Sequence, residues 1–550
     1  MRQQTFTTET QVDFVIVGSG ASGGVLAREL SRAGHTVVVL EQGPWRTAAD
    51  FEHDELGHWF LNDLMGSNAD FPQTFRHSAA EEAAVPSGIQ PLLYARGVGG
   101  SSVHMTANYW RFHPVDFKER SSWGAISGTS FADWPVTYEE LEPYYTKVDW
   151  EIGVSGAPGP FDPPRSRPYP VPPLPVKSSG VLLERGANKL GLHAQPAPMA
   201  ILSEPHNGRP ACQHCGFCMM YGCEYGAKSS TLAAMIPGAV ETGRCEVRAD
   251  STAFRIETSA AGRATGVLYW DAQGKEQRQR AGAVIIAANG AETTRLLLMS
   301  ESPRHTDGLA NSSGLVGKNL MFNGNWSAYG MFEHPLHEYK SMQVTRIVHD
   351  FYDSDAKRGF YGGGGIDGRM SQGSILFALF GLPQDAPWWG AEYKQMLSDY
   401  YVNTMELAVH TTSLPQESNS ISLDPTVKDK WGRPALRVTY KDHPDDIKTG
   451  EFLVSRANEI LDAAGASRTW SFPVQPQTLG AHLLGTARMG GDPRNSVVNA
   501  DHRAHDVANL FICDGSSFVT SGRGQPTMTI QALAFRAADR ISALARDNQI

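Results

Sequence analysis

Four cysteines lie close together in one short segment. Cys212, Cys215, Cys218 and Cys223 have the spacing C-x2-C-x2-C-x4-C, and the whole chain of 550 residues holds six cysteines. Thiolates this close in sequence can converge on one soft metal centre. The spacing approaches the C-x2-C-x2-C-x3-C run of iron–sulfur proteins, with a longer last gap and no proline after the final cysteine. The segment therefore predicts a metal site.

Two other roles for these cysteines remain open. A structural zinc ion needs four thiolates in a tetrahedron, for which a single contiguous run is cramped. Disulfides need an oxidising compartment, and we expect no secretory signal, because the first residues, MRQQTFTTETQVDF, lack an apolar core. The other two cysteines, Cys245 and Cys513, lie in strand-like stretches that are typical of inert buried thiols.

A glycine motif near the start predicts dinucleotide binding. Gly18, Gly20 and Gly23 satisfy G-x-G-x-x-G, which provides a tight turn, close approach of a pyrophosphate and close packing of helix on strand. Glu41 ends the next strand-like run, where a carboxylate accepts hydrogen bonds from a ribose. An acid at this position disfavours the 2′-phosphate of NADP and leaves FAD and NAD as candidates.

The elements around this motif indicate a strand–helix–strand unit. Residues 12–17, VDFVIV, predict a buried parallel strand, the next residues a helix that stops at Gly34, and residues 35–41 a second strand. Similar α/β segments occur at 283–288, AVIIAA, and in the last forty or so residues. We therefore expect one nucleotide-binding domain assembled from separated pieces of chain.

The intervening sequence has other local signals. Nine prolines between Pro158 and Pro175 predict an extended surface connection. Thr137 and Glu140 form a capping box ahead of a helix. The aromatic pairs Trp388–Trp389 and Tyr400–Tyr401 are able to stack on a sugar ring, although aromatic residues are more often part of a core.

Composition excludes several classes of protein. With 48 Lys and Arg against 58 Asp and Glu, the formal charge of −10 disfavours nonspecific binding to nucleic acid or to an anionic membrane. No apolar run approaches the ~20 residues of a membrane span. The mixture of 41% hydrophobic residues with both signs of charge is typical of a folded globular protein.

Four separated motifs give the chain a family resemblance. The glycine unit, RGVGGSSVH at 96–104, NGAETTRLLLMS at 289–300 and AHLLGTARMG at 481–490 resemble those of the glucose–methanol–choline (GMC) oxidoreductases, in family order. The resemblance runs from residue 12 to 540. It implies FAD rather than NAD, bound by a Rossmann-like domain with a parallel sheet.

The resemblance also implies how the chain is divided. The FAD-binding domain would comprise residues 1–115, 225–325 and 475–550. An α+β substrate domain built on an antiparallel sheet would comprise 116–224 and 326–474. The cysteine-rich segment 212–223 would lie near the junction of these interwoven domains.

Catalytic and flavin-contacting residues follow from the same motifs. His482, in a glycine-rich loop, would be the base that takes the hydroxyl proton while hydride leaves for the flavin. The family has His or Asn before a Pro-Thr pair, where this chain has Gln525, whose longer amide would orient the alcohol. The remaining residues implied to contact FAD are Gly99, Gly100, Ser101, His104, Val247, Asp514, Gly515 and Pro526. Some relatives attach the flavin covalently at the position of His104.

The cysteine segment, CQHCGFCMMYGCEYGAKSS, resembles the large flavin subunits of gluconate 2-dehydrogenase and glucoside 3-dehydrogenase. Some of these relatives carry a three-iron cluster, which needs three thiolates. We therefore favour a 3Fe-4S over a 4Fe-4S cluster at Cys212, Cys215, Cys218 and Cys223.

The predicted function is an FAD-dependent dehydrogenase that oxidises a secondary alcohol of a sugar or glycoside to a ketone. Electrons would leave through the cluster to an external acceptor, a cytochrome c or a quinone-linked carrier. By resemblance, a small subunit carrying an export signal would take the chain to the periplasm, with the cytoplasm as the alternative location.

Two rival functions are kept. One is an oxygen-using GMC alcohol oxidase that acts on an aromatic or other non-sugar alcohol, with zinc or no metal at the cysteines. The other is a flavoprotein that binds a ligand or partner without turnover, and the intact His482 motif disfavours it.

Overall fold

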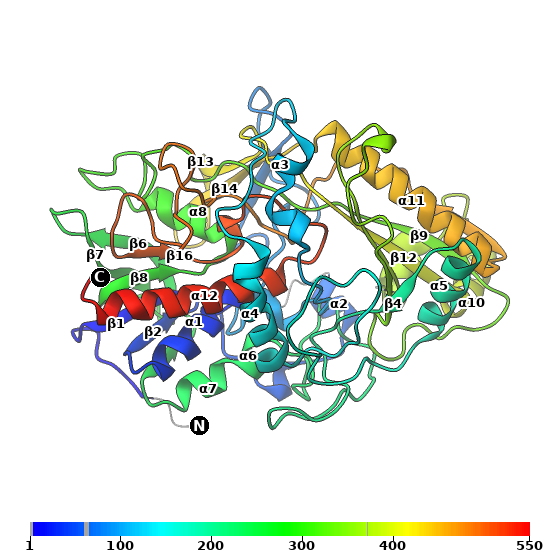
Figure 1. The fold of residues 1–550 in the computed structure, drawn as a ribbon, viewed down its shortest axis with the longest axis horizontal. Coiled ribbons are helices and arrows are strands. Elements are labelled where there is room, and N and C mark those ends of the chain that lie inside the picture. The colour runs from blue at the N-terminus through cyan, green and yellow to red at the C-terminus, as the bar shows by residue number, and fades with distance from the viewer. Residues whose placement is uncertain (1–3, 60–64, 371) are drawn as a thin grey trace.

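The computed structural model describes residues 4–59, 65–370 and 372–550. Within these ranges, no helix is both long enough and apolar enough to span a membrane. The described chain forms two larger sheets and a smaller third sheet (Figure 1).

The first sheet contains the strands predicted around the glycine motif. Its order is β5-β2-β1-β8-β7-β6, and β16 pairs with the later part of β8. Pairing is parallel from β5 through β8 and to β16, whereas β7 and β6 pair antiparallel. The strands are β1 (Val12–Val17), β2 (Val37–Leu40), β5 (Cys245–Arg248), β6 (Thr252–Thr258), β7 (Ala264–Trp270), β8 (Glu276–Ile286) and β16 (Leu510–Ile512). Strands far apart in sequence therefore build one parallel core, as predicted.

Helices from both ends of the chain pack together against this sheet. Figure 1 shows α1 (Ala21–Arg32) and α12 (Thr527–Arg546) lying side by side, and they are in extensive contact. The predicted capping box is present, because Thr137 and Glu140 cap α4 (Tyr138–Val148), which packs on α12. Further helices near this core are α6 (Thr231–Ala234), α7 (Ile236–Val240) and α8 (Asn289–Met299).

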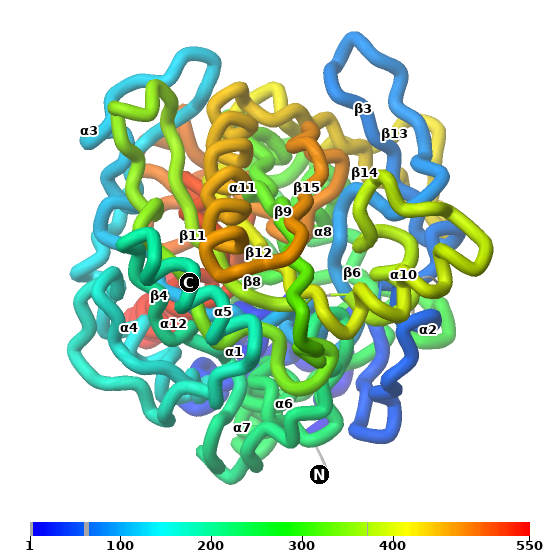
Figure 2. Tube along the Cα trace, turned by 90° about the vertical axis from the view of Figure 1, so that its right-hand side faces the viewer, coloured from blue at the N-terminus to red at the C-terminus, as the bar shows by residue number. Residues whose placement is uncertain are grey.

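The second sheet is antiparallel, with the order β15-β9-β12-β11-β10-β4. Its strands are β4 (Ala194–Pro196), β9 (Asn325–Met331), β10 (Arg346–Val348), β11 (Gly364–Arg369), β12 (Thr404–Thr411) and β15 (Arg468–Ser471). One face carries apolar side chains that are buried under α11 (Pro444–Ala464) and α5 (Ser178–Lys189). Figure 2 shows α11 lying across this sheet.

The remaining elements connect or flank these layers. A small sheet contains β3 (Gln73–Arg76), β13 (Ser420–Lys428) and β14 (Pro434–Thr439). Short helices are α2 (Glu55–Trp59), α3 (Glu119–Trp123) and α9 (Ser374–Leu376), and α10 (Gly390–Asn403) lies on the surface. A parallel sheet combined with a separate antiparallel sheet confirms the predicted α/β fold class. The proposed boundaries of the two domains stay a prediction.

Candidate active site

A cavity of about 470 Å³ lies between the two larger sheets. One wall contains Val17, Leu40 and Ala287, at the carboxyl ends of β1, β2 and β8. The opposite wall contains residues of β9, β11 and β12. Open α/β sheets bind ligands at the carboxyl ends of their strands. The cavity therefore joins the predicted dinucleotide turn to the antiparallel sheet.

The three glycines of the motif have different surroundings. Gly18 has φ +94°, and a Cβ there would lie 2.4 Å from the carbonyl oxygen of Ala287. A Cβ on Gly23 would lie 2.0 Å from the carbonyl oxygen of Gly18. A Cβ on Gly20 would be 3.9 Å from its nearest neighbour, in Gly100, and Gly20 lines the cavity. The first and third glycines thus close the turn, and the second leaves room at the amino terminus of α1, which fits a pyrophosphate.

Glu41 is buried at the cavity wall and ties the glycine turn to a neighbouring loop. Its carboxylate accepts hydrogen bonds from the backbone N–H of Ser19 (3.1 Å), the hydroxyl of Ser19 (2.7 Å) and the N–H groups of Gly43 (3.1 Å) and Gly97 (3.3 Å). Burial raises the pKa of Glu41, and these hydrogen bonds oppose the shift. A ribose hydroxyl would share this acceptor with Ser19.

The loop at 96–104 forms the next part of the wall. Gly99 and Gly100 have φ of +96° and +53°, and a Cβ on Gly100 would lie 2.8 Å from Gly20 Cα. Gly100, Ser101 and His104 line the cavity. Burial and the nearby Lys228 lower the pKa of His104 to about 3, and within the described residues its buried Nε2 has no hydrogen-bond partner. His104 is therefore a neutral imidazole with an unused polar atom, which fits a flavin neighbour.

The late chain segments complete the cofactor end. Asp514 accepts hydrogen bonds from the hydroxyl of Thr293 (2.6 Å) and the N–H of Ser516 (2.8 Å), and burial raises its pKa. Asp514, Gly515 and Pro526 line the cavity. Val247, on β5, is buried and is absent from the described lining.

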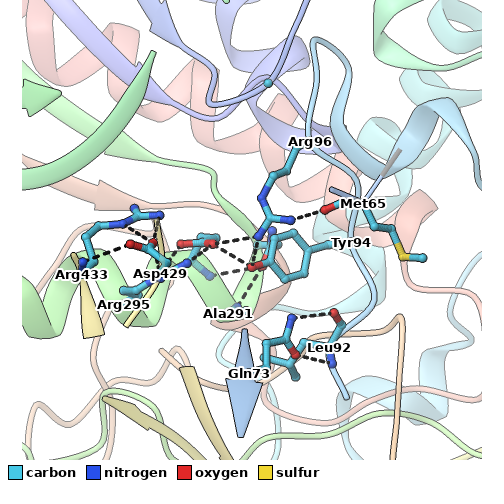
Figure 3. A network of polar contacts seen from close by, with 12 residues as sticks. Met65, Gln73, Leu92, Tyr94, Arg96, Ala291, Arg295, Asp429 and Arg433 are labelled. Carbon is cyan, nitrogen blue, oxygen red and sulfur yellow. Dashed lines mark hydrogen bonds and ion pairs between the residues drawn. The ribbon is translucent and has the colours of Figure 1, made fainter. Parts of the chain in front are cut away.

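Figure 3 shows a network of polar contacts, and four of its members, Tyr94, Glu292, Arg295 and Arg433, line the same cavity. Arg295 and Arg433 both contact Asp429, at 3.1 and 2.8 Å. The hydroxyl of Tyr94 donates to Glu292 (2.7 Å), and Arg96 contacts Tyr94 at 3.1 Å. Although burial opposes the shift, the arginines hold the pKa of Glu292 far below its usual range. Three guanidinium groups face two carboxylates, so the network leaves positive charge that suits an anionic cofactor.

The predicted catalytic pair lies at the end of the cavity next to the antiparallel sheet, where Gln525 contacts His410 of β12. His482 is half-buried and lines the cavity, with its Nδ1 3.2 Å from Oδ1 of Asn323. Burial and the nearby His410 lower the pKa of His482 to about 3. Gln525 also lines the cavity, with its amide nitrogen 3.3 Å from Nδ1 of His410. His482 is thus a neutral imidazole at neutral pH, as a proton acceptor must be.

Several polar residues at this end were not identified from the sequence. Asn323 contacts His482, and His410 contacts both Gln525 and the buried Asp367. Asn108, Arg369 and His410 line the cavity. Residues 404–411, TMELAVHT, alternate between apolar and polar side chains. This alternation indicates a strand with His410 on its polar face.

The cysteine segment packs directly against the cavity. Met219 and Met220, inside this segment, line the cavity, and the N–H of Met220 donates to the carbonyl of His104 (2.8 Å). Lys228 is buried and donates to the carbonyls of Met105, Cys218 and Tyr221, at 3.0, 2.5 and 2.7 Å. One ammonium group therefore joins the loop beside the cavity to the cysteine segment.

All four clustered cysteines are free of disulfides, and three of them lie close enough to Cys218 to act on its charge. Burial and the negative charge of the other three thiolates raise the pKa of Cys218 to about 12, although Lys228 opposes the shift. Among the described residues, His53, Cys215 and Glu224 form a group of possible metal ligands whose ligand atoms all lie within 4.8 Å of one another. No three of the four clustered thiols lie that close together. Zinc at about 2.3 Å from each sulfur would hold four thiolates about 3.8 Å apart. The thiols therefore have a wider spacing than a four-cysteine zinc site.

Other sequence-selected residues lie elsewhere. Cys245 and Cys513 are buried in the first sheet or directly after it, as expected. Trp388 and Trp389 are 78% and 84% exposed, and Tyr400 and Tyr401 pack against Trp470 and Tyr339. None of these four aromatic residues is part of the described lining of the cavity.

Comparisons with known proteins agree with this geometry. A family model described as GMC oxidoreductase matches residues 12–323, and a second with the same description matches residues 415–534. The chain is 35% identical to 2-methyl-1,2-propanediol dehydrogenase of Mycolicibacterium austroafricanum, over 98% of this chain and 96% of the relative. It is 30% identical to the fructose dehydrogenase large subunit of Gluconobacter japonicus (96% and 97% covered) and 28% identical to the gluconate 2-dehydrogenase flavoprotein of Pantoea cypripedii (96% and 93%).

The fold also matches a solved structure. Pyridoxine 4-oxidase aligns with a TM-score of 0.65 and 18% identity, over 96% of this chain and 98% of that structure. The likeness shows that the two chains share a fold.

Proposed function

This chain belongs to the GMC oxidoreductase family, which acts on CH–OH groups, and on that premise we propose that it is an FAD-dependent dehydrogenase that oxidises a secondary alcohol of a sugar or glycoside to a ketone. The clustered cysteines would hold an iron–sulfur cluster, which would supply a one-electron route to an external acceptor. The observation that carries the proposal is a single cavity bordered by the glycine turn, by His482 and by the cysteine segment.

FAD fits the cofactor end of the cavity. Gly20 leaves open space at the amino terminus of α1, and the orphaned Nε2 of His104 belongs to the same lining. The residues that would hold FAD are Gly18, Gly20, Gly23, Glu41, Gly99, Gly100, Ser101, His104, Val247, Asp514, Gly515 and Pro526. When bound, FAD supplies the acceptor for the hydride that leaves the carbinol carbon.

His482 is the base that accepts the hydroxyl proton. Its low pKa keeps the imidazole neutral, and the contact of its Nδ1 with Asn323 Oδ1 leaves Nε2 unprotonated. Gln525 orients the alcohol oxygen by a hydrogen bond from its amide. As the carbon loses hydride, the hydroxyl proton moves to Nε2 of His482, and a carbonyl forms.

The polar lining supports an alcohol with several hydroxyl groups. Asn108, Arg369, His410 and Gln525 gather at the end of the cavity that contains His482. These side chains offer hydrogen-bond donors and acceptors for more than one hydroxyl group. The relatives named as dehydrogenases of a diol and of fructose support the same substrate class.

The position of the cysteine segment beside the cavity supports a role in carrying electrons away. Met220 is hydrogen-bonded to His104 within the cavity wall, and Cys218 stands two residues earlier. Cys212, Cys215, Cys218 and Cys223 would hold a 3Fe-4S cluster, or a 4Fe-4S cluster if all four ligate. Such a cluster supplies one-electron chemistry beside the cavity.

A partner chain is part of the proposal. The relatives include proteins named as a large subunit and as a flavoprotein of a dehydrogenase. We infer a small subunit that carries an export signal, a cytochrome c or quinone-linked acceptor, and a periplasmic location. Co-purification of the chain with a tagged candidate subunit, followed by cell fractionation, tests this assembly.

The proposed chemistry is tested on the purified, FAD-loaded chain. We expect a three-iron electron paramagnetic resonance signal, iron and sulfide in stoichiometric amounts, and reduction of an artificial dye by sugars or glycosides. His482→Ala should reduce turnover by roughly 10²–10⁴-fold. Iron-free active protein would remove the cluster from the mechanism, and a fully active His482→Ala variant would remove the base.

One observation favours a second candidate. His53, Cys215 and Glu224 form a compact donor set of the kinds that zinc uses, with His53 Nε2 3.3 Å from Glu224 Oε2. This arrangement fits an oxygen-using alcohol oxidase with zinc at the cysteine segment. Stoichiometric zinc and peroxide formation in air, with no dye reduction, would favour the oxidase.

A further inference from the structure

The antiparallel sheet has one apolar and one polar face. On β11 and β12, Ile366, Leu407 and Val409 belong to the core under α11. The alternate residues, Asp367 and His410 among them, therefore project from the opposite face. The polar residues of that face are Asn325, Ser327, Asp367, Arg369, Glu406 and His410. Of these, Asn325, Arg369 and His410 line the cavity. The sheet thus presents a polar surface to the space beside the catalytic pair.

Asp367 is the centre of this polar surface. It is fully buried, and it accepts hydrogen bonds from Asn108 Nδ2 (2.9 Å), His410 Nε2 (2.8 Å) and the guanidinium of Arg369. Ala408 stands opposite Asp367 across the strand pair and Gly365 opposite His410, so small residues leave room for this cluster. The carboxylate itself is absent from the described cavity lining, but all three of its partners line the cavity.

The contact with Asp367 determines how the amide of Asn108 is turned. A carboxylate accepts hydrogen bonds, so the Asn108 group that faces Asp367 is the NH2. The other amide atom, Oδ1, is buried and has no hydrogen-bond partner among the described residues. Asn108 is 4% exposed and lines the cavity. A buried acceptor without a partner is costly, so this atom is open to a donor from water or from a substrate hydroxyl.

His410 connects this acceptor to the catalytic pair. Its Nε2 contacts Asp367, and its Nδ1 lies 3.3 Å from the amide nitrogen of Gln525. The imidazole of His410 therefore stands between two polar groups, with Gln525 on its Nδ1 side and Asp367 with its partners on its Nε2 side. One side faces the hydroxyl that reacts at His482, and the other lies at Asn108 and Arg369.

We propose that Asn108 and Arg369 form a second hydroxyl subsite, built on Asp367, that recognises the hydroxyl adjacent to the one oxidised. The neighbouring hydroxyl donates to Asn108 Oδ1 and accepts from Arg369. The substrate class is therefore the vicinal diol, which includes sugars, glycosides and simple 1,2-diols. The inference rests on the proposed function, because it takes the end of the cavity near His482 as the place of reaction.

Two alcohols that differ by one hydroxyl test the subsite. Butane-2,3-diol and butan-2-ol share a carbon skeleton and a secondary alcohol. Their dissociation constants for the FAD-loaded full chain are read from perturbation of the oxidised flavin spectrum. We expect the diol to bind at least tenfold more tightly, since one hydrogen bond within a charged network has about this effect. Equal affinities in the wild-type protein would overturn the proposal.

Variants separate the subsite from general stability. Asn108→Ala should weaken binding of the diol at least fivefold more than binding of butan-2-ol. Ser327→Ala is the matched control, because Ser327 lies on the same sheet face, bonds Glu406 and is absent from the described lining. A diol preference that persists in Asn108→Ala would contradict the proposal. If that variant does not fold, the wild-type ratio decides alone.

Failure of the proposed function would look different. Flavin that neither alcohol nor any sugar reduces under anaerobic conditions would count against a dehydrogenase. The ratio of dissociation constants would still be measured, because it is read from the oxidised flavin. A tenfold diol preference without reduction would therefore leave the subsite standing and the proposed reaction rejected.

Discussion

Asn323 Oδ1 lies 3.2 Å from Nδ1 of His482, and the protein itself determines which atom of the amide faces the imidazole. The amide nitrogen of Asn323 faces three backbone carbonyls, those of Thr411 (3.0 Å), Ser521 (3.4 Å) and Gly522 (3.2 Å). Only the NH2 group can donate to carbonyls, so Oδ1 must accept from Nδ1–H of His482. The tautomer of the proposed base is therefore determined by a residue 159 positions earlier in the chain.

Removing this contact should impair the proton transfer. In Asn323→Ala, Nδ1 of His482 loses its acceptor, so the imidazole is free to carry its proton on Nε2, where it cannot take one from the alcohol. We expect the rate of flavin reduction by saturating substrate to fall roughly 10–100-fold, less than the loss on removing the base itself, because the imidazole remains present. Anaerobic stopped-flow measurement of flavin reduction provides the rate.

The control for this variant is Asn419→Ala. Asn419 is also buried and bonds the backbone of Lys441 through both amide atoms, and within the described residues no hydrogen bond joins it to His482. Both variants should be less stable than the wild type, but only Asn323→Ala should reduce its flavin more slowly. Equal rates in the two variants would mean that Asn323 is structural.

Gly20 and Gly23 should respond differently to alanine. A methyl group on Gly20 has its nearest neighbour at 3.9 Å and enters the cavity, whereas one on Gly23 lies 2.0 Å from the carbonyl of Gly18. Gly20→Ala should leave the unfolding temperature of the apoprotein unchanged and weaken FAD binding at least tenfold, since the methyl blocks the approach of the pyrophosphate. Gly23→Ala should lower both the unfolding temperature of the apoprotein and the affinity for FAD. Calorimetry of apoprotein and FAD titration measure the two effects, and normal FAD affinity in Gly20→Ala would place the pyrophosphate elsewhere.

Local signals predicted the elements of the fold well. The strand at 12–17 coincides with β1, and the strand predicted at 35–41 contains β2. The capping box of Thr137 and Glu140 forms at the start of α4. Periodicity and capping act within a few residues, so one sequence is enough to read them.

Such local signals do not reveal the residues that surround the proposed catalytic pair. His410 and Asp367 meet because β11 pairs with β12 in one register, and Asn108 reaches Asp367 across 259 residues. Alternation shows which face of a strand is polar, but not which strands are neighbours. The motifs therefore led to His482 and Gln525, and the residues that orient them emerged only from the three-dimensional pairing.

Lys228 should control the contact between the cavity and the cysteine segment. Its ammonium donates to carbonyls of Met105, Cys218 and Tyr221. Lys228→Met removes all three hydrogen bonds and leaves buried carbonyls without donors, which should loosen the cysteine segment. If electrons leave by this segment, dye-linked reoxidation of the flavin should slow at least tenfold. Flavin reduction by substrate should change less than twofold.

A buried lysine elsewhere provides the control for this variant. Lys177 is 7% exposed at its side chain, donates to the carbonyl of Glu338 and pairs with the carboxylate of the same residue. Lys177→Met should destabilise the chain without a selective effect on reoxidation. Slowing of both half-reactions in Lys228→Met would show that the lysine supports the cavity rather than an electron route.

His502 should make the folded protein sensitive to acid. It is fully buried, and its Nδ1 lies 3.0 Å from the carbonyl of Ile512. Burial lowers its pKa from 6.5 to about 4, so the unfolded chain binds the extra proton first as the pH falls. The contribution of His502 to the free energy of unfolding is fully present above pH 6.5 and is lost as the pH falls from 6.5 to 4. At pH 5 the loss from this group is about 2 kcal/mol.

His502→Asn isolates that contribution, because asparagine tolerates the positive φ of 62° at this position. The variant will differ from the wild type at every pH through its changed contacts, so the quantity to compare is the fall in unfolding free energy between pH 7 and pH 5. Urea titrations at the two values should show a fall about 2 kcal/mol smaller in the variant. His334→Asn is the control, since His334 is exposed and its side chain stays in water when the chain unfolds. An unchanged fall in His502→Asn would mean that His502 takes up its proton within the folded protein.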